Sequence, residues 1–386
     1  MPPTVAYLAQ GKVRLKVGSK PPRTIESPYG NSILEKQVRA QQRNSWKSQG
    51  GGFLSGAVLW GSGGAMQGPT PVYITSISSG AEKGRLIYSM ESGSLCALLA
   101  TENLGDEEKR LWNNNNFKLH HVSACPHTGN LAFSIVHSNG TANIGVMLKG
   151  ETGVKELTEG DSVDTAPQWL TGEPRRIIFQ SAGIGRDRHG HFLALGPFSI
   201  QELNLDSAEL GIILEDERTD YVSPRVTADE TMYYIRRPCT SQGRVSPLKS
   251  LKDIVFFPFR LGYAIFQYLN FFSVRYTGRK LTTAGDARAR EMDMKQMMIW
   301  GNIINAQQAA ESEEAADLVP ASWQLARRRA GSAEEILARN VLAYDLGEDG
   351  TIAYSNGNAI FLLSPDGRKE RLVSERMIEQ VVILGA

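Results

Sequence analysis

Metal chemistry is conceivable first at the histidines, which are unusually clustered in this chain. All six lie in two neighbouring stretches, at positions 120, 121, 127, 137, 189 and 191. His189 and His191 are one residue apart, so both rings would face the same side of an extended segment. Zinc requires three or four ligands, with a cysteine or carboxylate within reach, and the sequence around this pair does not supply them. We therefore expect solvated histidines, no metal and no cofactor.

Nucleophilic and phosphate chemistry lack their usual settings. A serine hydrolase places its nucleophile in a G-x-S-x-G elbow between a strand and a helix, whereas Ser94 and Ser79 fall in expected hairpin turns. The glycines at 50–52 and 61–64 are not flanked by the strand and helix of a nucleotide-binding βαβ unit. The sequence therefore predicts no catalytic residue.

The most unusual stretch is an apolar insert at residues 244–275. Asp253, Arg260 and Gln267 recur every seven residues and would share one narrow stripe of a helix, which leaves a wide aromatic arc. Pro258 would kink such a helix. The residues predicted to dock a protein partner or a membrane are Phe256, Phe257, Phe259, Arg260, Tyr263, Phe266, Phe271 and Phe272.

Three environments were weighed for this insert. A transmembrane span requires about 20 apolar residues with almost no charge, and Arg260 stands near the middle of the segment. A span would also separate strands that must pair in one sheet. A helix on an anionic membrane surface suits the basic residues on both flanks, and packing against protein suits the aromatics. Protein packing is our first expectation and membrane contact the second.

Outside the inserts, the chain repeats a pattern of four short strands separated by polar turns. Residues 161–214 form one such cycle and residues 215–238 begin the next, whose last two strands are expected after the insert, at residues 272–283. Residues 323–337 look like part of a further unit. Met377–Leu384 supplies a strand that the first unit, which starts at Val5, lacks, and this predicts that the two ends of the chain pair.

The fold prediction is therefore all-β, a single β-propeller domain over residues 1–386. Seven blades are expected, with six or eight left open. Residues 27–71 are expected to be an inserted loop or strand segment, and residues 284–322 a helix-rich insert. Closure by the N- and C-terminal strands would leave no free inner edge.

Composition restricts the partners. There are 42 Lys and Arg against 41 Asp and Glu, so no overall field attracts nucleic acid, and the short arginine clusters at 186–188, 236–237 and 327–329 are expected to be surface charge. Cys96, Cys125 and Cys239 form no metal knuckle or disulfide framework and are expected to be buried thiols. The first residues do not resemble a secretion signal, which indicates a cytoplasmic location.

Two motifs suggest a family. A-P-Q-W followed by R-R-I-I-F-Q-S, and S-P-R-V-T-A-D-E followed by T-M-Y-Y-I, resemble the repeat of TolB-like β-propellers. The resemblance implies a propeller whose loops bind proteins or peptides, without implying a chemistry. We expect a non-catalytic scaffold that binds a protein partner through its rim and apolar insert. The alternative is a propeller hydrolase or metal-dependent lactonase with acidic and histidine side chains at the channel mouth.

Overall fold

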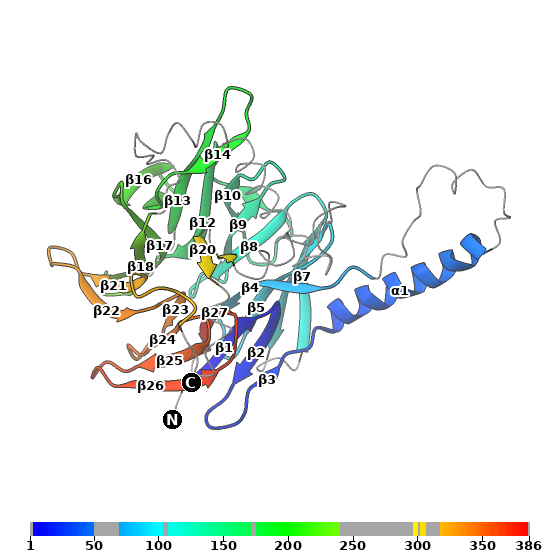
Figure 1. Cartoon of the computed structure of the whole chain (residues 1–386), viewed down its shortest axis with the longest axis horizontal. Coiled ribbons are helices and arrows are strands. Elements are labelled where there is room, and N and C mark those ends of the chain that lie inside the picture. Colours follow the sequence, from blue (N-terminus) through cyan, green and yellow to red (C-terminus); the bar gives the residue numbers. More distant parts are fainter. Residues whose placement is uncertain are drawn as a thin grey trace.

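The computed structural model describes residues 3–49, 69–102, 107–170, 175–239, 296–299, 302–305 and 317–384. These residues are almost entirely β-strands in four-stranded antiparallel groups (Figure 1). The groups, each from its inner to its outer strand, are β27 (Ile378–Leu384), β1 (Thr4–Ala9), β2 (Lys12–Lys16) and β3 (Arg23–Thr24); β4 (Tyr73–Ser79), β5 (Leu86–Ser92), β6 (Leu95–Glu102) and β7 (Glu107–Asn114); β8 (Lys118–Ala124), β9 (Leu131–Val136), β10 (Ala142–Met147) and β11 (Lys155–Glu156); β12 (Ser162–Trp169), β13 (Arg176–Arg186), β15 (Ser199–Asn204) and β16 (Glu209–Leu214); β17 (Thr219–Val226), β18 (Met232–Pro238), β21 (Gln324–Arg328) and β22 (Glu335–Arg339); and β23 (Ala343–Leu346), β24 (Ile352–Ser355), β25 (Ala359–Leu363) and β26 (Lys369–Ser374).

Two details complete this topology. A single parallel bridge between Ala142 and Val163 joins the groups that begin with β8 and β12 into one nine-stranded sheet. That sheet includes β14 (Phe192–Leu195), which pairs with the end of the long strand β13.

The predicted pairing of the chain ends is confirmed. Strand β1 lies between β2 and β27, and its register with β27 runs from Thr4 opposite Leu384 to Ala9 opposite Ile378. Residues from the two ends of the sequence therefore share one sheet, which we call the closing group (β27, β1, β2 and β3).

Strand β1 shows why these strands are apolar at nearly every position. Side chains alternate between the two faces of a strand, and both faces of β1 are covered. Val5, Tyr7 and Ala9 pack with the group of β23 to β26, whereas Ala6 and Leu8 pack with the group of β4 to β7. Further hydrophobic clusters lie between the other consecutive groups, so the core consists of layers between sheets rather than one central mass.

The inner strands carry a bulge that explains the proline motifs. The register between the first and second strands shifts at His121, Ala166 and Ser223, and these residues have φ of 50°, 54° and 56°. The bulges of β12 and β17 contain the A-P and S-P dipeptides. Neighbouring groups supply acceptors for the inner-strand amides: Val122 N donates to Ser76 Oγ at 2.9 Å, Ser223 N to Gln180 Oε1 at 2.6 Å and Ile77 N to Gln380 Oε1 at 2.8 Å.

The structure corrects the parsing of the later repeats. Strand β18 pairs with β21 from Met232 opposite Arg328 to Arg236 opposite Gln324. The stretch interpreted as part of a separate unit at residues 323–337 therefore completes the unit begun by β17 and β18. The expected strands at residues 272–283 lie outside the described residues.

The two other inserts also differ from expectation. Residues 28–49, expected to form a loop or strand, are the helix α1 (Pro28–Gln49), because Pro28 suits the first helical position and strong helix formers follow it. Part of the segment expected to be helix-rich is instead a hairpin of β19 (Gln296–Ile299) and β20 (Asn302–Asn305), whose two-residue connection is typical of hairpins. In the described part of the chain, no helix is both long and apolar enough to cross a bilayer.

Candidate functional site

The eight docking residues predicted between Phe256 and Phe272 lie outside the described residues. The histidines are described, and they separate into different environments. His189 and His191 lie in the hairpin between β13 and β14, with ring centroids 6.1 Å apart, and His191 Nδ1 is 3.1 Å from Asp187 Oδ2. His137 pairs with Glu156 at 2.8 Å. Over the ranges that the structure describes, no three His, Cys, Asp or Glu side chains gather as a metal site would require.

Two predictions about charged and thiol side chains need correction. Arg237 is not surface charge, because only 2% of its side chain is exposed and its Nε donates to Asp220 at 3.0 Å. Its guanidinium also stacks on Trp323, 4.6 Å from the ring centroid. Cys96 and Cys125 are buried as expected, but Cys239 is partly exposed.

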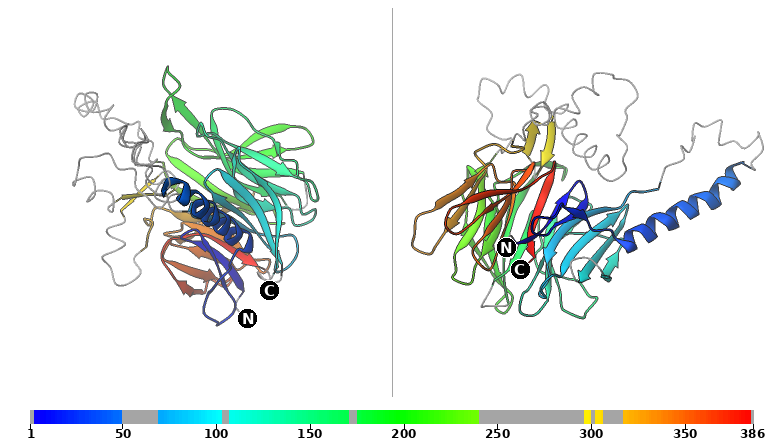
Figure 2. Two further views of the ribbon diagram at one scale, coloured as in Figure 1. Left: turned by 90° about the vertical axis from the view of Figure 1, so that its right-hand side faces the viewer. Right: turned by 90° about the horizontal axis from the view of Figure 1, so that it is seen from below.

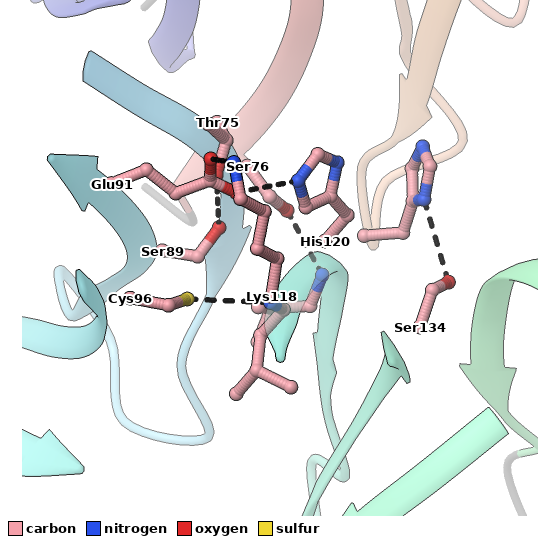
Figure 3. A network of polar contacts seen from close by, with 11 residues as sticks. Thr75, Ser76, Ser89, Glu91, Cys96, Lys118, His120 and Ser134 are labelled. Carbon is pink, nitrogen blue, oxygen red and sulfur yellow. Dashed lines mark hydrogen bonds and ion pairs between the residues drawn. The ribbon is translucent and has the colours of Figure 1, made fainter. Parts of the chain in front are cut away.

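A buried charge cluster joins the groups of β4 to β7 and β8 to β11 (Figure 3). Glu91, near the end of β5, has a fully buried side chain, and both of its oxygens have cationic partners from β8. Lys118 Nζ lies 2.6 Å from Oε2 and His120 Nε2 lies 2.7 Å from Oε1. Because Lys118 and His120 are two residues apart on one strand, their side chains point to the same side and meet a single carboxylate.

The electrostatics of this cluster keep Glu91 ionised. Burial raises the pKa of Glu91, but the hydrogen bond and charge of His120, together with the charge of Lys118, outweigh burial and hold the pKa below its ordinary value. Beside it, Cys96 Sγ accepts a hydrogen bond from Leu119 N at 3.3 Å, and burial raises the pKa of this thiol to about 12. The arrangement fixes one sheet against the next and leaves a protonated, unreactive thiol.

A second set of polar residues lies on the inner strands. Arg225 of β17 and Asp345 of β23 approach to 3.7 Å, and Asp345 Oδ2 accepts a hydrogen bond from Ile383 N of β27 at 2.8 Å. Burial raises the pKa of Asp345 despite the charge of Arg225. On β8, burial and the charges of His120 and Arg225 lower the pKa of His121 to about 3.

His121 is therefore expected to make the protein sensitive to mild acid. Its folded pKa of about 3 lies below the value of about 6.5 for an unfolded histidine, so between these values the unfolded chain binds a proton that the folded chain does not. Stability is then lost as the pH falls below about 6.5, by up to about 4 kcal/mol in total. The substitution His121→Asn, which tolerates a positive φ, should flatten urea midpoints measured between pH 7 and pH 5. The exposed-turn variant His127→Asn is the control, and parallel profiles for all three proteins would contradict the assignment.

The helix α1 is attached to the sheets only near its first turn. Ser27 Oγ accepts a hydrogen bond from Gly30 N at 3.0 Å, the arrangement of an N-cap. Glu108 of β7 accepts hydrogen bonds from Ser27 Oγ at 2.8 Å, from Tyr29 N at 3.1 Å and from Tyr88 Oη at 2.9 Å. A carboxylate at this end also complements the helix dipole. The anchor therefore combines capping with ionic attraction.

Beyond this anchor, α1 extends away from the sheets (Figures 1 and 2). Gln37 makes the last described contact with the sheets, through Nε2 to Ser92 Oγ at 3.0 Å. Lys36, Arg39 and Arg43 are exposed, and their spacing of three and four residues places them on one face of the helix. Glu35 is the only acidic residue of the helix, and it pairs with Arg39 at 3.3 Å. We call Lys36, Arg39 and Arg43 the basic stripe.

Comparisons with known proteins identify the fold. No protein-family model matches the sequence, and no curated protein matches it. The chain is similar in structure to TolB from Acinetobacter baumannii, with a TM-score of 0.52, 11% identity, and coverage of 99% of this chain and 66% of that one. It is also similar to a chain in the nidogen/laminin complex, with a TM-score of 0.52, 6% identity, and coverage of 99% and 98%. The fold is that of a TolB-like β-propeller.

This TolB-like propeller spans about two thirds of the TolB chain that it matches. At these identities the likeness concerns the fold alone. What is particular to this propeller are the elements added to the sheets. Of these, α1 is the described one that leaves the sheets with a charged and exposed surface, and it is the candidate functional site.

Sequence reasoning identified the basic residues of α1 but not the helix. The signals were present: Ser27 followed by Pro28 is a helix start, and the spacing of Lys36, Arg39 and Arg43 matches the helical period. The glycines at 50–52 drew the interpretation of this TolB-like propeller towards a loop. Glu91 was missed because nothing in the local sequence M-E-S separates it from an ordinary strand end.

Proposed function

We propose that this chain is a cytoplasmic, non-catalytic β-propeller scaffold that binds a protein partner through its rim and its inserted segments. The observation that carries the proposal is α1, which is capped onto β7 and then extends from the sheets with an exposed basic stripe. The apolar insert at residues 244–275 is proposed as a second contact, with protein first and a membrane surface second.

We infer that the ring of this scaffold has six blades. The inner strands β27, β4, β8, β12, β17 and β23 each begin a group of four. Side chains connect neighbouring groups, including Tyr344 Oη of β23, which donates to Ser223 O of β17 at 2.7 Å. Joining β21 and β22 to β17 and β18 reduces the expected seven units to six.

The partner proposed for α1 is an acidic protein surface. Three cations within two helical turns attract a surface of opposite charge and accelerate its association. A helix that lies on a membrane needs a broad apolar face, whereas Val38 and Ala40 are the only apolar residues between Lys36 and Arg43. A protein with exposed Asp and Glu therefore fits the stripe better than lipid does.

The test is charge reversal of the basic stripe. The variant K36E/R39E/R43E is expected to lose its partners in quantitative affinity capture from the native cell, by about tenfold at physiological salt. Because these side chains are exposed, thermal unfolding should be unchanged.

A matched control keeps the same change in charge. Arg368, Lys369 and Arg371 are exposed residues at strand β26, and R368E/K369E/R371E should capture the same proteins as wild type. Equal capture by the α1 variant and the wild type would remove α1 from the proposal.

A further inference from the structure

Strand β16 is an outer strand with an unusual sequence. Its six residues are E-L-G-I-I-L, and it pairs only with β15, so its other edge carries unpaired backbone groups. Leu210 is 56% exposed, Ile212 57% and Ile213 46%. A Cβ atom added at Gly211 would meet nothing within 4 Å. The strand lies at the outer limit of its sheet (Figure 1).

The other outer strands are protected against edge pairing. Strand β7 contains E-E-K-R, β26 begins K-E-R, and β22 begins and ends with charged residues, whereas β3 and β11 have only two residues each. Charged residues and short length are the usual means of preventing edge pairing. Strand β16 has one charged residue, at its first position. The contrast within one molecule indicates that this edge is kept open for a partner.

The charges around β16 indicate the chemistry of that partner. Acidic residues flank the apolar run on both sides, and no Lys or Arg occurs between residues 206 and 217. The flanking acids are Asp206, Glu209, Glu215, Asp216 and Glu217, all of them exposed. A segment that pairs with β16 would therefore be favoured by Lys or Arg at its ends.

Pairing with a second copy of this chain is disfavoured by the same charges. In an antiparallel pair centred on Gly211 and Ile212, Glu215 of each copy would lie opposite Ala208 of the other, next to its Glu209. Like charges at such positions destabilise a sheet. The edge thus suits a different molecule.

We propose that β16 is a strand-addition site for an extended segment of another protein, with an apolar, β-branched centre and basic flanks. Main-chain hydrogen bonds to the free edge of β16 provide the attachment, and the acidic flanks select the charge of the segment. This site involves none of the residues of α1, so it stands independently of the function proposed for that helix.

The experiment uses the full chain and a synthetic peptide of alternating valine and threonine with paired lysines at both ends. Saturable binding is expected by fluorescence anisotropy, with slowed hydrogen exchange at the β16 amides. The variant Ile212→Lys should weaken binding by about tenfold or more, and Ile336→Lys on β22 should not change it. The same peptide with alternate amides N-methylated keeps its charge but cannot form the ladder, and it should not bind.

Three results would overturn the proposal: no binding of the peptide, equal binding of the N-methylated peptide, or protection of amides elsewhere than in β16. A concentration-dependent dimer that Ile212→Lys abolishes would assign the edge to self-association instead. Thermal unfolding of both lysine variants verifies folding, and Leu210→Lys gives a second, independent disruption of the same edge.

Discussion

A chain that ends at Met377 is expected to lose its cooperative unfolding transition at room temperature. The truncation removes β27, whose Ile378, Val381, Val382, Ile383 and Leu384 are each less than 10% exposed. Burying one such side chain contributes about 1.5–3 kcal/mol, so five contribute about 8–15 kcal/mol, which equals the whole stability of an ordinary domain at about 5–15 kcal/mol. Strand β1 would also be left with an open edge. Near-ultraviolet circular dichroism and limited proteolysis would follow the loss.

Two further samples separate this effect from a general effect of shortening the chain. A chain that ends at Leu384 keeps every residue of β27 and should unfold like the full chain. Adding an excess of a peptide that spans residues 375–386 to the truncated protein should restore part of the native signal. A truncated protein with an unchanged transition would show that pairing between the two ends contributes little.

The double substitution of Lys118→Met with His120→Leu is expected to lower the free energy of unfolding by about 3–5 kcal/mol at pH 7, because it leaves a buried carboxylate without a partner. Glu91 has no exposed side-chain surface and both its partners come from β8. Since the cluster lowers the folded pKa of Glu91, the stability it contributes is present above the unfolded value of about 4.3 and is lost as the pH falls through the folded value. Urea denaturation at pH 7 measures the difference.

Adding Glu91→Leu to the double variant should recover most of the lost stability, because an apolar trio of similar size often replaces a buried ionic cluster at little cost. Recovery would attribute the loss to the unpaired charge rather than to changed packing on β8. If the triple variant is no more stable than the double variant, or if the double variant matches the wild type, the carboxylate is not the cause.

The strand pattern was predictable because it depends on local sequence. The alternation in β1 and the additional apolar run of β27 were enough to predict that they pair, and the A-P and S-P dipeptides marked repeating units. The grouping of β17 and β18 with β21 and β22 was not predictable, since the next strand of that sheet follows a long insert. Sequence pattern identifies a strand, but it does not tell which strand is its neighbour.

Less of the candidate site could be predicted. The charges of Lys36, Arg39 and Arg43 were evident, but their exposure depends on α1 leaving the sheets after Gln37. The partners of Glu91 come from a different sheet, and their approach depends on how the bulged strand β8 packs against β5. The exposure of Ile212 is equally a property of the outer position of β16, because E-L-G-I-I-L has the composition of a buried strand.

The long connection between β18 and β21 has a consequence for how this architecture can change. Its ends, at Pro238 and Gln324, are held as neighbours by one antiparallel ladder, whatever lies between them. The entropy lost by closing a loop grows only with the logarithm of its length, so doubling this connection costs about 0.6 kcal/mol. A complete folded module could therefore be accommodated here while the sheet keeps its register, which makes this position a natural port for acquiring new domains during evolution or by engineering.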